Sequence, residues 1–277
     1  QHNRRGPAPD RVPGRGARYT VDVAVIGVGP GGPRQITLEA VDALGRLDAV
    51  VLLDKGESTA SMRRLRTEML ERYAPDCDVL VVADPPRDRH PSDYATEVRR
   101  WHAARVDAIA EAIAALPEQP GRDRVVGFLV WGDPSLYDST LRVVDALAAR
   151  PDWSVHLSVI PGVTSASALT AAHGITANRI GEPVHITTGR RLPSTPEAVA
   201  GNQIVMLDGA EAFRAAARPG DEIYWGANLG TDDEVVISGP VEQVADEISA
   251  AREECKRRAG WVMDIYLLRS PDVVEGT

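Results

Sequence analysis

The sequence predicts an α/β protein built from two domains. In the first half of the chain, short apolar strands alternate with helical segments, which is typical of a parallel sheet covered by helices. Strands in this half end in turns that contain glycine or proline. In the second half, two of the expected strands alternate apolar and polar residues more strongly, as antiparallel or edge strands do.

The first half contains five expected strands. The strand at 20–26 is almost continuously apolar, as in a strand buried on both faces, and apolar residues from Ile36 to Leu47 then recur at helical spacing. Further strands are predicted at 48–54, 78–83, 124–130 and 155–160, and helices at 61–73, 92–116 and 140–149. This order indicates parallel strands joined by helical crossovers.

The second half has a different pattern. Strands are expected at 184–187, 203–207, 222–225, 234–239 and 261–268, with helices at 165–173, 211–217 and 241–258. We therefore place a domain boundary near residue 160, with a parallel sheet in residues 20–160 and a mixed sheet in residues 161–277. Residues 1–19 are rich in Pro, Gly and Arg, lack the apolar segment of a signal peptide, and are expected to form a disordered arm.

Composition and charge exclude several classes of protein. The 277 residues are 43% hydrophobic and 26% charged, which is typical of a globular protein rather than a disordered or fibrous one. The net charge of −9 argues against nucleic-acid binding. Cys77 and Cys255 fit neither a disulfide framework nor a zinc site, so we expect no metal and a cytoplasmic location. No apolar run approaches the roughly 20 residues that span a bilayer.

A glycine-rich turn follows the first strand. Gly27, Gly29 and Gly32 form a G-x-G-x-x-G pattern, and Asp54 ends the next strand, as in Rossmann domains that bind a dinucleotide. Pro30 and Pro33 weaken that hypothesis, because the start of such a helix needs free N–H groups facing the pyrophosphate. Two interpretations stay open: an NAD- or FAD-dependent oxidoreductase, and a turn where glycine only permits close backbone approach.

Two further motifs follow strands. Trp131-Gly-Asp-Pro-Ser-Leu-Tyr137 comes directly after the strand at 124–130, and Asp133 within it is either a turn residue or a ligand-binding carboxylate. Pro161-Gly-Val-Thr-Ser-Ala-Ser167 turns the chain and provides Thr164 or Ser165 as a helix cap. Since the carboxyl ends of parallel strands lie along one edge, we expect one ligand to contact all three turns.

The order of these motifs resembles that of the tetrapyrrole (corrin/porphyrin) methyltransferases, over residues 20 to about 270. The resemblance implies two αβα domains with a cleft for S-adenosyl-L-methionine (SAM) between them, the tetrapyrrole methylase fold. Phe128–Thr140, Tyr224–Gly230 and Gly260–Arg269 are most similar to members that methylate C1 of precorrin-5 and release acetate. It also implies precorrin-6A and S-adenosyl-L-homocysteine as products, a role in aerobic cobalamin synthesis, and a homodimer.

The resemblance further assigns site residues. Those expected to line SAM are Pro30, Gly132, Asp133, Ser135, Leu136, Thr164, Ser165, Ala166, Met206, Leu207, Gly226 and Ala227. Among them Met206 and Leu207 are expected to cover the adenine, while Gly29 lies beside the macrocycle. The chain departs from the family after the third glycine, where Gly32-Pro33-Arg34 stands in place of an acidic residue and proline.

The implied reaction has two parts with different needs. Methyl transfer requires alignment of carbon, methyl and sulfur but no protein nucleophile. Acetate release requires water to add to a carbonyl, which favours a general base and an oxyanion donor. Candidates by residue type, each of which also has a purely structural interpretation, are Asp54, His90, Tyr94 and His102.

Arginine is the expected partner of the substrate, because precorrins carry many carboxylates and guanidinium binds carboxylate with two hydrogen bonds. Among the 31 basic residues only Lys55 and Lys256 are lysine. The side chains predicted to bind the substrate are Arg87, Arg89, Arg190 and Arg191. A sister precorrin methyltransferase acting on another ring carbon, and a tetrapyrrole carrier without turnover, remain alternatives.

Overall fold

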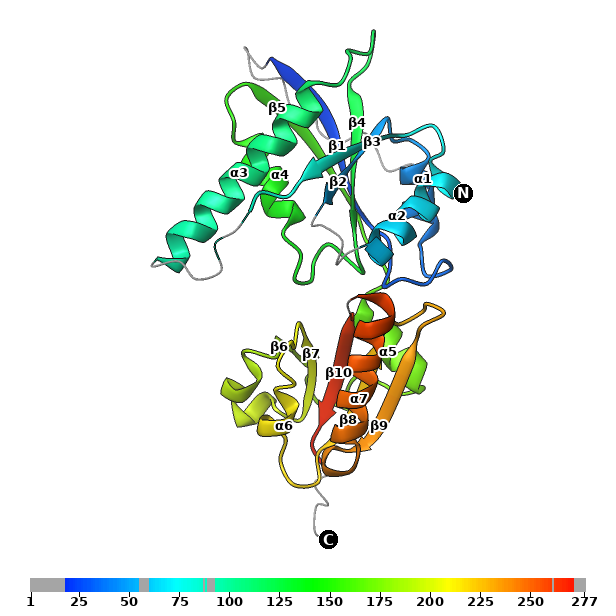
Figure 1. The fold of residues 1–277 in the computed structure, drawn as a ribbon, viewed down its shortest axis with the longest axis vertical. Helices are drawn as coiled ribbons and strands as arrows, with labels where there is room; N and C mark the ends of the chain where they lie inside the picture. Colours follow the sequence, from blue (N-terminus) through cyan, green and yellow to red (C-terminus); the bar gives the residue numbers. More distant parts are fainter. Residues whose placement is uncertain (1–17, 55–59, 87, 89–92, 261, 272–277) are drawn as a thin grey trace.

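Two αβα units lie end to end along the long axis of the molecule (Figure 1). The computed structural model describes residues 18–54, 60–86, 88, 93–260 and 262–271. The first unit contains a five-stranded sheet of β1 to β5, and the second a five-stranded sheet of β6 to β10. The predicted α/β class is therefore confirmed, while most of the predicted N-terminal arm lies outside the described residues.

The first sheet is parallel throughout and has the order β3-β2-β4-β1-β5. Its strands are β1 (Tyr19–Gly27), β2 (Ala49–Asp54), β3 (Asp78–Ala83), β4 (Arg124–Val130) and β5 (Trp153–Ile160). β1 pairs with β4 in register from Val21 opposite Arg124 to Gly27 opposite Val130. Both strands are buried on both faces over most of their length, which is why they are apolar almost without alternation.

Helices cover both faces of the first sheet (Figure 1). They are α1 (Leu38–Leu44), α2 (Ala60–Tyr73), α3 (Tyr94–Ala114) and α4 (Thr140–Ala148). α1 and α2 pack on one face through residues such as Leu44 and Leu70, and α3 and α4 pack on the other through Ile109 and Leu147. α1 begins at Leu38, later than the predicted Ile36, because the Thr37 hydroxyl caps the helix by accepting a hydrogen bond from Ala40 N–H.

The second sheet is mixed, as predicted, and has the order β6-β7-β10-β8-β9. Its strands are β6 (His185–Thr188), β7 (Asn202–Met206), β8 (Glu222–Ala227), β9 (Val235–Pro240) and β10 (Asp264–Arg269). β6 and β7 are parallel, and the other pairs are antiparallel. Of the two alternating segments, β9 is an edge strand, whereas β10 is the central strand and begins at Asp264 rather than at residue 261.

Helices also cover both faces of the second sheet. They are α5 (Ser165–His173), α6 (Phe213–Ala216) and α7 (Val241–Ala259), with short 3₁₀ helices η2 (Leu192–Ser194) and η3 (Glu197–Val199). α6 and α7 pack on one face through Phe213 and Ile248, and α5 packs on the other through Leu169. β5 ends at Ile160, after which the chain enters α5 on the second sheet.

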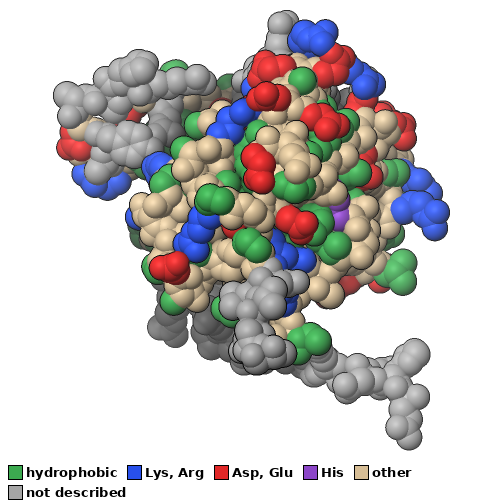
Figure 2. Space-filling view, turned by 90° about the horizontal axis from the view of Figure 1, so that it is seen from below, with side chains coloured by type: hydrophobic (Ala, Val, Ile, Leu, Met, Phe, Trp, Pro, Cys, Tyr) green, Lys and Arg blue, Asp and Glu red, His purple; other side chains and the backbone are tan. Residues whose placement is uncertain are grey.

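The surface carries charges of both signs. Seen from the end formed by the second unit, acidic and basic side chains are interspersed (Figure 2). Among the described residues, no helix is long and apolar enough to cross a membrane.

Asp48 joins the starts of β2 and β4 and is expected to make stability depend on pH. Its Oδ2 accepts hydrogen bonds from Val125 N–H at 2.8 Å and Arg122 Nη1 at 2.7 Å. The Arg122 hydrogen bonds, against an opposing effect of burial, lower the pKa of Asp48 to about 2. In the unfolded chain an aspartate has a pKa of about 3.9.

A carboxyl group with a lowered folded-state pKa stabilises the fold above its unfolded pKa, and this contribution is lost as the pH falls through the folded value. Asp48→Asn should therefore lower the free energy of unfolding at pH 6, and the difference from wild type should shrink between about pH 4 and pH 2. Urea unfolding across this range measures it, with the exposed Asp76→Asn as control. An equal difference at pH 6 and pH 2 would contradict the expectation.

Candidate active site

Three turns at the carboxyl edge of the first sheet meet backbone to backbone. Gly132 N–H donates to Gly29 O at 2.8 Å, and Gly29 N–H donates to Gly132 O at 3.2 Å. A β-carbon on Gly27 would lie 2.6 Å from Gly162 N, and one on Gly162 would clash with Gly132 O. The predicted convergence of the three turns is thus observed, and glycine is needed at 27 and 162 because no side chain fits between the turns.

Asp133 fastens the second turn to the third. Its Oδ1 accepts hydrogen bonds from Ser135 N–H at 2.8 Å and from the Ser135 hydroxyl, and its Oδ2 accepts one from Gly162 N–H at 2.8 Å. Partial burial opposes ionisation, but these hydrogen bonds hold the pKa of Asp133 below its ordinary value. Both carboxylate oxygens therefore accept hydrogen bonds from the loops, which supports the interpretation of Asp133 as a turn residue.

The glycine-rich turn faces the second unit rather than the start of a helix. A β-carbon on Gly32 would lie 2.8 Å from Gly230 O, and one on Gly31 would lie 2.9 Å from Thr231 Cγ2. α1 starts only at Leu38, after the Thr37 cap. A Rossmann site requires the glycine turn to lead into free N–H groups at the helix start. The geometry therefore argues against the dinucleotide alternative.

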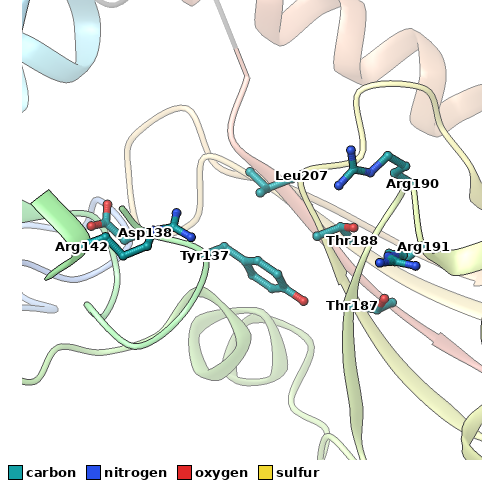
Figure 3. A pocket seen from close by; sticks show the side chains of 8 residues that line it. All are labelled: Tyr137, Asp138, Arg142, Thr187, Thr188, Arg190, Arg191 and Leu207. Atoms are coloured by element: carbon teal, nitrogen blue, oxygen red, sulfur yellow. The ribbon is translucent and has the colours of Figure 1, made fainter. Parts of the chain in front are cut away.

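A pocket of about 640 Å³ lies between the two units (Figure 3). Its lining residues are Tyr137, Asp138 and Arg142 from the first unit, and Thr187, Thr188, Arg190, Arg191 and Leu207 from the second. The Tyr137 side chain extends toward β6, and its hydroxyl donates to Ile186 O at 3.3 Å. Tyr137 thus connects the GDPSLY turn to the edge strand of the second sheet.

The pocket is rich in arginine. The side chains of Arg142, Arg190 and Arg191 are exposed, and within the described ranges of the chain none of them forms an ion pair. By contrast, Arg105 on α3 is buried and paired with Asp84 at 2.6 Å. Guanidinium groups without a protein counter-ion favour an anionic ligand with carboxylate groups.

Leu207 provides an apolar surface in the same pocket. Its side chain is 66% exposed, and its φ of 54° lies in the left-handed region, which is strained for leucine. The next residue, Asp208, is buried and accepts hydrogen bonds from the Tyr266 hydroxyl at 2.6 Å and Ala212 N–H at 2.7 Å. Arg252 donates to Asp208 O at 3.0 Å. These buried contacts hold Leu207 in place beside the pocket.

Of the residues predicted for the site, three line this pocket: Arg190, Arg191 and Leu207. Others lie in the converging turns and at the start of α5, namely Gly29, Pro30, Gly132, Asp133, Ser135, Leu136, Thr164, Ser165 and Ala166. Met206 ends β7. Gly226 and Ala227 are buried at the end of β8, where a β-carbon on Gly226 would lie 2.8 Å from Leu229 Cδ2. The structure therefore places both in the packed interior.

The predicted candidates for a general base do not line the pocket where the structure describes their side chains. Asp54 lies at the end of β2, and His102 lies on α3 with its ring centroid 4.9 Å from that of Trp101. Arg87, Arg89 and His90 lie outside the described residues, and of Tyr94 only the backbone is described.

Five lining residues were missed by sequence reasoning. Tyr137 and Asp138 directly follow the GDPSL motif, so their position next to a recognised turn was an available signal. Thr187 and Thr188 end β6, which is another strand-end signal. Arg142 lies in the first turn of α4 and had no signal, because only the packing of the two units brings it to the pocket.

Known proteins are similar to this chain in sequence and in architecture. The model of the Tetrapyrrole (Corrin/Porphyrin) Methylases matches residues 22–245. The chain is 42% identical over 249 residues to precorrin-6A synthase (deacetylating) of a Sinorhizobium species, covering 89% of this chain and 94% of that protein.

Two solved structures are also similar. The putative cobalamin synthesis related protein (CobF) from Corynebacterium diphtheriae is 39% identical, with a TM-score of 0.79, and the match covers 92% of this chain and 100% of that one. Uroporphyrin-III C-methyl transferase from Thermus thermophilus, complexed with S-adenyl homocysteine, shares the fold at 19% identity and a TM-score of 0.53, over 90% and 92% of the two chains. With its two αβα units and its three converging turns, the chain belongs to the tetrapyrrole methylase family.

Proposed function

We propose that the protein is a SAM-dependent methyltransferase that methylates C1 of precorrin-5 and releases acetate, giving precorrin-6A in aerobic cobalamin synthesis. The observation that carries this proposal is the similarity, along nearly the whole chain, to a precorrin-6A synthase (deacetylating). The unpaired arginines of the pocket support it, because they suit a substrate with several carboxylates.

The residues between the units fit SAM. Leu207 presents an exposed apolar side chain that an adenine ring would cover, and Met206 precedes it at the end of β7. The first turn of α5 offers backbone N–H groups at Ser165 and Ala166, while the Thr164 hydroxyl already accepts Ser167 N–H at 3.1 Å. Such N–H groups bind a carboxylate. When bound, SAM supplies an electrophilic methyl group on a sulfonium.

The chain contributes binding and orientation to methyl transfer. The backbone contacts among the three turns make this part of the proposed site rigid, since no side chain separates them. Arg142 lies on one unit, and Arg190 and Arg191 lie on the other (Figure 3), which supports a role in holding carboxylates of the macrocycle from opposite sides. Fixing the ring carbon in line with the methyl group lowers the entropic part of the barrier.

The proposed function is tested by incubation with precorrin-5 and SAM. We expect a product that has gained one methyl group and lost the acetyl group, with one acetate released for each methyl transferred. Methylation without acetate would indicate a sister enzyme, and macrocycle binding without turnover would indicate a carrier. Calorimetric titration with S-adenosylhomocysteine and with NAD tests the remaining alternative, an NAD- or FAD-dependent oxidoreductase. Binding of NAD without binding of S-adenosylhomocysteine would overturn the proposal of a methyltransferase.

Replacing both Arg190 and Arg191 with glutamine should raise the KM for precorrin-5 about tenfold or more, because a charged hydrogen bond contributes about 1.5–3 kcal/mol. The affinity for S-adenosylhomocysteine should stay within about twofold of wild type, since the proposed SAM contacts lie in other residues. Arg257→Gln/Arg258→Gln, an adjacent exposed pair on α7, is the matched control. Unchanged kinetics in the pocket variant would contradict a substrate role.

We further propose a cytoplasmic homodimer. Cys77 and Cys255 are free thiols, as is usual in a reducing compartment. The family resemblance supports the dimer, and sedimentation equilibrium of the purified protein tests it.

A further inference from the structure

Acetate release, the second half of the proposed reaction, requires a base near the substrate. Water must be deprotonated as it adds to the acetyl carbonyl, and a carboxylate or imidazole within hydrogen-bond reach can take the proton. Among the described residues that line the pocket, Asp138 is the one carboxylate (Figure 3). Neither Asp54 nor His102 lines it.

A hydrogen bond orients the Asp138 side chain at the start of α4. It directly follows Tyr137 and precedes Ser139, the N-cap of α4, and its Oδ1 accepts a hydrogen bond from Thr140 N–H at 2.6 Å. No hydrogen bond from another described residue reaches its Oδ2. One oxygen is therefore engaged by the helix start, and the other is available to a molecule in the pocket.

The other charged side chains that line the pocket, among the described residues, are cationic. Arg142 lies on α4, which begins just after Asp138, and Arg190 and Arg191 line the pocket from the second unit. On α2, burial lowers the pKa of Arg66, and the charge of Asp138 opposes that shift. A carboxylate and several guanidinium groups that line one pocket combine a proton acceptor with donors that stabilise an oxyanion.

We propose that Asp138 is the general base for acetate release, an inference that rests on the proposed function. The oxygen of a water molecule forms a bond to the acetyl carbonyl carbon, and one water proton passes to Asp138 Oδ2. The carbonyl oxygen becomes an oxyanion facing the pocket arginines. When it collapses, the bond joining the acetyl carbon to the ring breaks, and the electron pair stays on the ring carbon. Acetic acid leaves and ionises to acetate, and Asp138 returns its proton to solvent.

The test compares Asp138→Asn with wild type in single-turnover reactions with precorrin-5 and SAM. Asparagine keeps an acceptor for Thr140 N–H but cannot take a proton, so we expect acetate release to slow about 100-fold or more. Binding of S-adenosylhomocysteine, measured by calorimetry, should stay within about twofold of wild type. Asp138→Glu should recover part of the rate, and Asp145→Asn, exposed on α4, should match wild type.

The pH profile supplies a second readout. The wild-type rate of acetate release should fall at low pH as a carboxylate becomes protonated, whereas the residual rate of Asp138→Asn should lack that limb. A variant that binds S-adenosylhomocysteine normally and releases acetate within about threefold of wild type would overturn the role of Asp138 alone. Wild-type protein that methylates a precorrin without releasing acetate would overturn the proposed function as well.

Discussion

Gly162→Ala should destabilise the protein by about 1–3 kcal/mol or more and weaken binding of S-adenosylhomocysteine at least tenfold. The new methyl group would clash with Gly132 O and lie 2.9 Å from Gly27 Cα. Both neighbours are backbone atoms of buried turns, so neither can move aside as a flexible side chain does. The three turns must separate, and the hydrogen bond from Gly162 N–H to Asp133 is strained with them.

Urea unfolding and calorimetric titration measure the two effects. Gly45→Ala is the matched control, because its β-carbon would meet nothing closer than Val41 O at 3.7 Å and its φ of −65° suits alanine. We expect the control to differ from wild type by less than about 0.5 kcal/mol. If Gly162→Ala bound S-adenosylhomocysteine as tightly as wild type, the close contact of the turns would not matter for the site.

Arg252→Met should lower the free energy of unfolding by about 3–5 kcal/mol, since breaking a buried ion pair leaves an uncompensated charge. Arg252 Nε donates to Asp264 Oδ2 at 2.8 Å, and the two side chains are only 8% and 11% exposed. Burial already raises the pKa of Asp264 above its ordinary value, although Arg252 opposes this. The deficit of the variant in the free energy of unfolding, relative to wild type, should therefore shrink at low pH, where Asp264 becomes neutral.

The same substitution should also affect the proposed SAM site. Arg252 also donates to Asp208 O, next to the strained Leu207, so its loss should weaken binding of S-adenosylhomocysteine. Arg257→Met, which removes an exposed pair with Glu254 on the same helix, should cost about 0–1 kcal/mol. Chemical unfolding at pH 8 and pH 5 measures the difference. Equal destabilisation by the two substitutions would show that the buried pair contributes no more to stability than the exposed pair.

Much of the fold was predictable because its strands and helices carry strong local patterns. β1 and β4 are apolar almost throughout, since parallel strands at the centre of a covered sheet meet helices on both faces. α5 and β3 were predicted with their observed bounds. The meeting of three turns at one edge also followed from parallel strand order alone.

The candidate site was less predictable. Arg190 and Arg191 were found by their chemistry, whereas Arg142 was missed because nothing in its neighbourhood along the chain marks it. The role of Asp133 was left open, because whether a carboxylate faces a ligand or its own loop depends on which N–H groups lie within about 3 Å of it. Those groups belong to Ser135, two positions away, and to Gly162, on another strand.

Local patterning along the chain was sufficient to establish the α/β class, the order of strands and helices and the membership in a methyltransferase family. The class and the element order depend on periodicity and on turn residues, which neighbouring positions encode, and the family was indicated by the resemblance of the motifs. The pocket depended on how the two units pack, which brings Tyr137 and Arg142 from one unit against Arg190 and Leu207 from the other. Contacts between residues this far apart in the chain arise from burial and shape across the whole molecule, so only the folded structure reveals them.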